Sequence, residues 1–102
     1  MQSEKSIKEK LKYAQEYGQD VQNIIWENCE ETQIKIQKAE INKSKFLNCK
    51  CTEADFSRSH FTNVIFENCD FSNTNFSETE FTEVQFINCK MIGCNFTDSS
   101  IY

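Results

Sequence analysis

The chain has 102 residues, a net charge of −5 at neutral pH, six cysteines, two glycines and no proline. This length suits one domain, and the polar N-terminus has no apolar stretch of signal-peptide or membrane-spanning length, so we expect a soluble, non-exported, cytoplasmic protein. The acidic balance disfavours direct binding of nucleic acid, because neutralising phosphates requires a basic surface.

Residues 1–20 predict a short amphipathic helix. Its signals are a candidate capping box, an apolar stripe and a C-terminal stop, formed by Ser6 with Glu9, by Ile7, Leu11 and Ala14, and by Gly18. We expect this helix to cover the first turn of the repetitive structure that follows. A partner-binding or membrane helix is the alternative, but the stripe is short and the segment evenly charged, which is unlike a membrane anchor.

Residues 21–102 form one repeat in which every fifth residue is large and apolar, usually phenylalanine. From position 36 the series is Ile36, Ile41, Phe46, Cys51, Phe56, Phe61, Phe66, Phe71, Phe76, Phe81, Phe86, Met91, Phe96 and Ile101. A smaller residue lies two positions before each of these from Ala39 onward, and a tetrapeptide ending in Asn-Cys recurs every 20 residues.

A period of five matches neither a helix nor a continuous strand. The small and the large residue, two apart, share one face of a short extended side, and the next pair stays inside only if the chain turns a corner. Four right-angled corners close a coil of about 20 residues, so the sequence predicts a square, all-β solenoid of about four coils. Side chains 20 apart then form columns about 4.8 Å apart.

These residues resemble the pentapeptide-repeat family, whose repeat is Ala-(Asp/Asn)-Leu/Phe-x-x. The closest segments are Ala54-Asp55-Phe56-Ser57, Cys69-Asp70-Phe71-Ser72 and Cys94-Asn95-Phe96-Thr97. The resemblance covers about residues 21–102 and implies a right-handed quadrilateral β-helix. The Phe-rich, Cys-containing style resembles the Qnr-type quinolone-resistance proteins of bacteria.

The cysteines are expected to be reduced core residues. Cys29, Cys49, Cys69 and Cys89 fall in one inward column, and Cys51 and Cys94 occupy other inward positions. Parallel side chains in a column do not give the disulfide dihedral, and they do not converge tetrahedrally as a zinc thiolate site requires. We therefore expect no metal or other cofactor.

No outward residue suggests catalysis. His60, the only histidine, shares an outward column with Glu40 and Glu80, and a solvated surface is the favoured interpretation. The Asn28, Asn48, Asn68 and Asn88 column is expected at corners, where asparagine tolerates turn conformations. Glu31 occupies a position where the pattern favours phenylalanine, so the coil either deforms there or is open to water. We expect a protein that is not an enzyme.

Charge is the one surface signal for function. Residues 51–102 carry two positive and eight negative side chains, a net −6, whereas residues 21–50 are at +1. The acidic part spans about 12 Å of solenoid, over which duplex DNA carries about seven charges. The candidate partner-binding residues are therefore Glu53, Asp55, Glu67, Asp70, Glu78, Glu80, Glu83 and Asp98.

The last coil offers a second candidate surface. Its apolar residues Phe86, Met91, Phe96, Ile101 and Tyr102 have no following coil in this sequence to cover them. Association of two copies end to end would cover them, and the resemblance implies such a homodimer; the alternative is that the chain is part of a longer protein.

Two functions follow as hypotheses. The resemblance implies a DNA mimic that enters the DNA groove of DNA gyrase or topoisomerase IV and protects the enzyme from fluoroquinolones or modulates its activity. The alternative is a non-catalytic structural or protein-interaction solenoid with no topoisomerase target.

Overall fold

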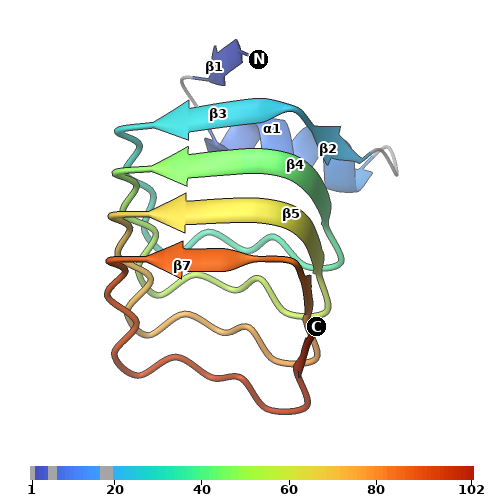
Figure 1. Ribbon diagram of the computed structural model, residues 1–102, viewed down its shortest axis with the longest axis vertical. Coiled ribbons are helices and arrows are strands. Elements are labelled where there is room, and N and C mark those ends of the chain that lie inside the picture. The colour runs from blue at the N-terminus through green and yellow to red at the C-terminus, as the bar shows by residue number, and fades with distance from the viewer. Residues whose placement is uncertain (1, 5–6, 17–19) are drawn as a thin grey trace.

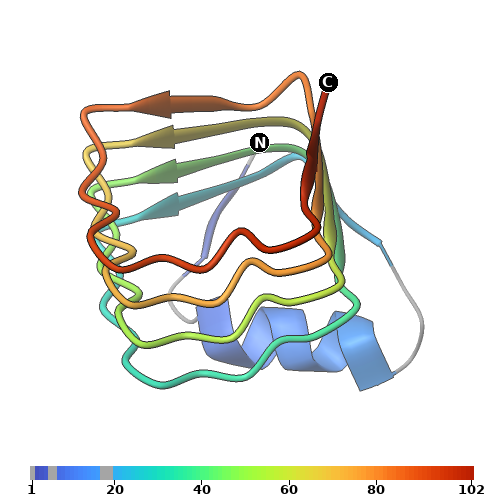
Figure 2. The ribbon, with the colours of Figure 1, turned by 90° about the horizontal axis from the view of Figure 1, so that it is seen from below.

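The computed structural model describes residues 2–4, 7–16 and 20–102, and from Val21 onward the chain is a four-sided β-solenoid of about four coils (Figure 1). All strands pair in parallel in one sheet of order β1-β3-β4-β5-β6-β8, with β2 beside β4 and β7 beside β5. The strands are β1 (Gln2–Glu4), β2 (Val21–Gln22), β3 (Ile24–Glu27), β4 (Glu40–Leu47), β5 (His60–Glu67), β6 (Glu80–Thr82), β7 (Gln85–Ile87) and β8 (Ser100–Ile101). Viewed from below, the coils superimpose on a four-sided outline (Figure 2).

A residue with left-handed backbone conformation forms every corner. Positive φ angles recur at each fifth position from Asn23 to Asp98, in fifteen non-glycine residues and Gly93. The φ values of the four predicted corner asparagines lie between 52° and 56°. This confirms the predicted fivefold alternation of one short side and one turn.

Successive coils are held together by a backbone ladder with a register of 20 residues. The Cys51 amide donates to the Asp70 carbonyl over 2.8 Å, and the Asp70 amide donates to the Cys49 carbonyl over 2.9 Å. Strand partners such as Phe46 and Phe66 are likewise 20 apart. Each coil therefore supplies the hydrogen bonds that its neighbour needs.

The phenylalanines form the predicted columns inside the solenoid. Phe61 and Phe81 stack with ring centroids 5.5 Å apart and planes 7° from parallel, and Phe66 stacks on Phe86 at 4.9 Å. Adjacent columns meet edge to face, as Phe66 and Phe71 do at 5.0 Å and 88°. Both geometries are favourable for aromatic rings, so one core combines stacking along the axis with edge contacts across it.

The small inward residues also make hydrogen bonds. The Thr74 hydroxyl donates to the Cys51 carbonyl over 2.9 Å, and the Cys69 thiol donates to the Phe46 carbonyl over 3.3 Å. Both donors lie 23 residues after their acceptors, as do Cys49, Thr79, Cys89, Cys94 and Ser99. The sequence predicted these cysteines as apolar filler, but most also satisfy a carbonyl that the preceding coil leaves open.

The N-terminal helix α1 (Ile7–Glu16) packs against the first coil. Leu11 is fully buried and Ala14 is 6% exposed within the solenoid core, and Gln15 Nε2 donates to the Gln37 carbonyl over 2.6 Å. A capping helix was predicted, but strand β1, which pairs with β3, was not. The predicted capping residue Ser6 and the stop at Gly18 lie outside the described residues.

The first coil contains two irregular core positions. Glu31 keeps the register, because its amide donates to the Lys50 carbonyl over 2.8 Å, and its side chain is half-buried. The coil is therefore open at this position and not deformed. Trp26 is fully buried and contacts Phe46, but its indole Nε1 has no hydrogen-bond partner in the described part of the chain.

Candidate partner-binding surface

The solenoid has four outward faces, and we name one of them after His60. The His60 face carries two outward columns, Asp20, Glu40, His60, Glu80 and Ser100, and Gln22, Asn42, Thr62, Thr82 and Tyr102. Two corners bound it. The Arg58 corner contains Lys38, Arg58, Glu78 and Asp98, and the Lys43 corner contains Asn23, Lys43, Asn63 and Glu83.

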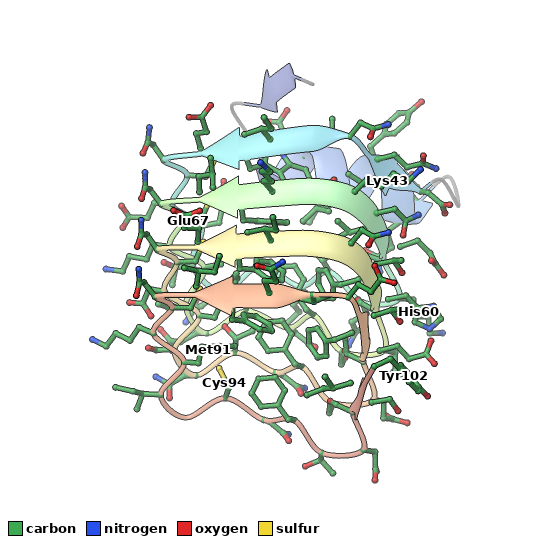
Figure 3. The ribbon with its side chains drawn as sticks, viewed as in Figure 1. Lys43, His60, Glu67, Met91, Cys94 and Tyr102 are labelled. Carbon is green, nitrogen blue, oxygen red and sulfur yellow. The ribbon has the colours of Figure 1, made fainter. Side chains whose placement is uncertain are left out.

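Four of the eight predicted acidic residues gather on this face, and four do not. Glu80 lies on the His60 face, and Glu78, Glu83 and Asp98 lie on its corners. We call these four the acidic half of the His60 face. Asp55, Asp70, Glu53 and Glu67 lie on the other sides of the solenoid, and Figure 3 shows Glu67 on the edge opposite Lys43, His60 and Tyr102.

Asp55 and Asp70 are turn residues. Asp70 Oδ1 accepts the Ser72 amide over 3.0 Å and the Ser72 hydroxyl over 2.7 Å, and these hydrogen bonds lower the pKa of Asp70. Partial burial raises the pKa of Asp55, but hydrogen bonds from Ser57 and Gln37 outweigh it, so the net shift is downward. Asn75 Oδ1 accepts the Ser77 amide in the same way. Asp or Asn before the phenylalanine therefore closes an Asx turn.

His60 connects two carboxylates along its column. His60 Nδ1 lies 3.0 Å from Glu40 Oε1, and His60 Nε2 lies 3.2 Å from Glu80 Oε2. Only a doubly protonated ring donates to both carboxylates at once. All three side chains are about half exposed, so this ladder joins three coils but contributes little to stability.

The two corners of the His60 face carry charge where the backbone favours asparagine or glycine. Six positive-φ positions hold Lys, Arg or Glu, namely Lys38, Lys43, Glu53, Arg58, Glu78 and Glu83. All except Glu53 lie on the two corners of this face. A non-glycine residue in this conformation costs about 1 kcal/mol, and asparagine or aspartate tolerates it better than long side chains do. Gln33, on the Glu53 corner, also has a long side chain at positive φ, so strain of this kind occurs on three of the four corners and is absent from the corner with the four asparagines.

The predicted end residues do lie on the last coil. Phe86 and Met91 are half-buried, and Phe96, Ile101 and Tyr102 are 39%, 76% and 73% exposed. Phe96 stacks on Phe76 with centroids 5.4 Å apart, so one side of its ring is covered and the other is not. In the structure, this end of the core has no covering segment comparable to α1 (Figure 1).

The cysteines show no reactive site. Within the described residues none of the six forms a disulfide; Cys29, Cys49, Cys51 and Cys69 are buried, and Cys89 and Cys94 are half-buried. Burial raises the pKa of the Cys51 thiol to about 12 and also raises the pKa values of Cys89 and Cys94. The hydrogen bond between the Cys49 and Cys69 thiols raises the pKa of Cys49 and lowers the pKa of Cys69, and Cys69 is only 2% exposed. Buried, protonated thiols are poor nucleophiles.

A shallow depression lies at the Lys43 corner. It has a volume of about 280 Å³ and is lined by Asn63, Ile65, Glu83, Val84 and Gln85. Its lining has one acid–base group, the Glu83 carboxylate, and no cysteine or hydroxyl nucleophile. Within residues 2–4, 7–16 and 20–102, no three His, Cys, Asp or Glu side chains are grouped to hold a metal ion.

Comparison with protein families agrees with this architecture. A model described as pentapeptide repeats (8 copies) matches residues 39–78, and one described as a pentapeptide repeat region matches residues 59–102. The chain belongs to the pentapeptide-repeat family. No curated protein matches it. Both matches concern the repeat itself and do not identify a subgroup.

A pentapeptide-repeat solenoid such as this one presents extended surfaces suited to protein interaction. No helix in the described part of the chain is long and apolar enough to cross a bilayer. Grouping the charges by half-chain does not show that Lys38, Lys43 and Arg58 lie on the same face as the acidic half. Arg58 lies 20 residues before Glu78, and Lys38 and Lys43 lie 40 residues before Glu78 and Glu83; these multiples of the 20-residue coil are the signal that identifies them.

Proposed function

We propose that this pentapeptide-repeat protein binds a protein partner in place of DNA, and that the partner is DNA gyrase or topoisomerase IV. The observation that carries the proposal is the clustering of Glu78, Glu80, Glu83 and Asp98 on one face and its corners. Glu78, Glu83 and Asp98 are exposed and have no ion pair with any residue that the structure describes. They can therefore meet a basic groove without first breaking an internal contact.

The fixed spacing of the solenoid supports this function. Glu78 and Asp98 are one coil apart, about 4.8 Å along the axis, and Glu83 lies on the opposite corner of the face. Two edges of negative charge on a rigid rod are a simple imitation of the phosphate rows of a duplex. Rigidity also limits the entropy lost on binding. Occupying the groove would modulate the enzyme or protect it from fluoroquinolones.

A homodimer through the last coil would lengthen the rod. The uncovered aromatic and aliphatic groups of Phe96, Ile101 and Tyr102 support this part of the proposal, since a second copy would remove them from water. Substituting Phe96→Asp should then give a folded monomer by sedimentation at high ionic strength, where contacts between charged faces are screened. A dimer that survives both the substitution and high salt would contradict assembly through this end.

Purified protein should inhibit gyrase supercoiling, or restore it in the presence of ciprofloxacin, in a manner that weakens as salt rises. Failure of a folded sample to change either reaction at micromolar concentration, with gyrase and topoisomerase IV both tested, would refute the topoisomerase target.

The second candidate is a protein-interaction solenoid with a different partner. Lys38, Lys43 and Arg58 favour it, because they place positive charge on the same face as the acidic half, unlike the uniformly negative surface of DNA. Under this candidate, topoisomerase activity is unchanged, and a partner would contact both halves of the face.

A further inference from the structure

The charges on the corners of the His60 face are ordered along the solenoid axis. The Arg58 corner reads Lys38, Arg58, Glu78 and Asp98, two positive followed by two negative side chains. The Lys43 corner reads Asn23, Lys43, Asn63 and Glu83, with the positive residue again before the negative one. All six charged side chains are exposed, and none forms an ion pair within residues 2–4, 7–16 and 20–102.

We propose that two copies of the chain associate side by side and antiparallel through their His60 faces. A two-fold axis lying between the faces and parallel to their strands reverses each column and places it opposite itself. Arg58 then meets the partner copy's Glu78, and Lys38 meets Asp98. On the other corner, Lys43 meets Glu83. Each pair occurs twice, so the order of charge makes this face self-complementary.

One axis satisfies both corners. The Arg58 corner is symmetric about a point between Arg58 and Glu78, and the Lys43 corner is symmetric about Asn63. These midpoints differ by five residues, a quarter of a coil, or about 1.2 Å along the axis at sheet spacing. Long lysine, arginine and glutamate side chains absorb a displacement of this size. No change of backbone is needed.

The face between the corners is suited to close approach. It is a regular surface of β4, β5 and β6 with two outward columns: Asn42, Thr62 and Thr82 have short side chains, and Glu40, His60 and Glu80 form a column in which His60 lies between the two carboxylates. The molecule measures 30 × 26 × 25 Å, so one face is roughly a sixth of its 5826 Å² of accessible surface. That is about 1000 Å² per copy, which is comparable with the roughly 800 Å² per partner of a standard interface.

The backbone supplies an independent argument. Lys38, Lys43, Arg58, Glu78 and Glu83 all adopt positive φ, at a cost of about 1 kcal/mol each. The corner with Asn28, Asn48, Asn68 and Asn88 uses asparagine in the same conformation throughout, whereas the fourth corner, away from this face, also has long side chains at Gln33 and Glu53. Among the described residues, the charged residues of the His60 face corners make no ion pair that offsets the cost. Ion pairs with a second copy of the chain would explain why charged side chains occupy these corner positions.

This association has a consequence for partner binding. It would cover Glu78, Glu83 and Asp98 with the basic half of a second copy, so self-association and binding of a basic partner exclude one another. The inference does not depend on the topoisomerase target, because it uses only the charges of this chain. It also differs from assembly through the last coil, which leaves the His60 face open.

A charge-swap series measured by sedimentation equilibrium tests the interface. Wild-type protein should dimerise at low ionic strength and dissociate as salt rises. Arg58→Glu and Glu78→Arg, each alone, should weaken the dimer by roughly tenfold or more, because each places two like-charge pairs in the interface. The double variant R58E/E78R should regain wild-type affinity. All substitutions stay at the same positive-φ positions, and the thermal unfolding midpoint of each variant reports on its folding.

Two controls separate this interface from others. Glu53→Arg adds positive charge at a positive-φ corner away from the His60 face and should leave the dimer unchanged. Phe96→Asp, which disrupts the last coil, should also leave this dimer intact. A dimer that Phe96→Asp abolishes and Arg58→Glu does not would place association at the end of the solenoid and overturn the proposal.

Zero-length carbodiimide crosslinking identifies the contacts. Mixed ¹⁴N- and ¹⁵N-labelled protein should give intermolecular Lys38–Asp98 and Lys43–Glu83 crosslinks. Within one protomer Lys38 and Asp98 are about 14 Å apart along the axis, too far for a direct amide bond, whereas Lys43 and Glu83, about 10 Å apart, are near the limit of reach, so the mixed labels identify which crosslinks join two protomers. A monomer at low salt and millimolar protein, or a failure of R58E/E78R to restore affinity, would refute the antiparallel dimer.

Discussion

The side chain of Asn73 occupies the space that a side chain at Gly93 would need. A Cβ atom built at Gly93 overlaps Asn73 Oδ1, and the φ angle of Gly93 is +76°. We predict that Gly93→Ala lowers the free energy of unfolding by about 1–2 kcal/mol in urea denaturation, from this overlap and the left-handed backbone together. Adding Asn73→Ala should recover part of the loss. An unchanged stability of Gly93→Ala would mean that the last coil adjusts freely.

The corner conformation predicts a stabilising substitution at Glu53. This residue is exposed with a φ of 55°, and the next residue in its column is Asn73. Glu53→Asn should raise the free energy of unfolding by about 0.5–1 kcal/mol, because asparagine tolerates positive φ better than glutamate. Lys45→Asn, at an exposed strand position, is the control and should give no gain. Equal effects at both positions would argue against backbone strain as the cause.

The buried indole of Trp26 predicts an asymmetry between two substitutions. Trp26→Phe extends the Phe46 column and removes an N–H without a partner among the described residues, so stability should change by less than about 1 kcal/mol. Trp26→Ala should cost about 3–5 kcal/mol, because it opens a cavity in the first coil. Chemical denaturation of both variants measures the difference. A large loss for Trp26→Phe would show that the indole itself is required.

The Asx turns predict a loss of stability in acid. The pKa values of Asp55 and Asp70 are lowered in the folded chain, so the stabilisation from their ionised forms is present above the unfolded value of about 3.9 and is lost as pH falls through the folded values. Unfolding free energy measured from pH 6 to about pH 2 should therefore decline less steeply for D55N/D70N than for wild type. Asparagine keeps the turn, as Asn75 and Asn95 show. Parallel curves would contradict this origin.

The fold could be predicted from the sequence because its period is unusually informative. A large residue every five positions and Asn-Cys every twenty determine the number of sides, the register and the aromatic columns. Strand β1 could not be predicted, because three residues carry no period and their partner β3 lies 22 positions away. The hydrogen bonds of the inward cysteines were also missed, since residue size alone does not show which carbonyls remain open.

The candidate surface was predicted only in part, for a geometrical reason. Counting charge along the chain combines all four sides of a coil, so Asp70 and Glu80 look equivalent although they lie on different faces. Sorting the same residues by their position within the 20-residue coil separates turn carboxylates from exposed corner charges. The same sorting reveals that Arg58 and Glu78 share a corner.

Because turn carboxylates and exposed corner charges lie on different faces, two sets of charge-neutralising variants should differ in their effect on any partner that binds the acidic half. E78Q/E83Q/D98N should reduce partner binding, measured as gyrase inhibition or protection, by roughly tenfold or more, since each lost exposed contact contributes up to about 1 kcal/mol. E53Q/E67Q/D70N removes the same charge from the other sides and should have a much smaller effect. Because both variants are at −2, long-range electrostatics alone would weaken them equally. Equal losses would therefore show that net charge, and not the His60 face, governs binding, whereas a greater loss for the second set would place the partner on another side of the solenoid.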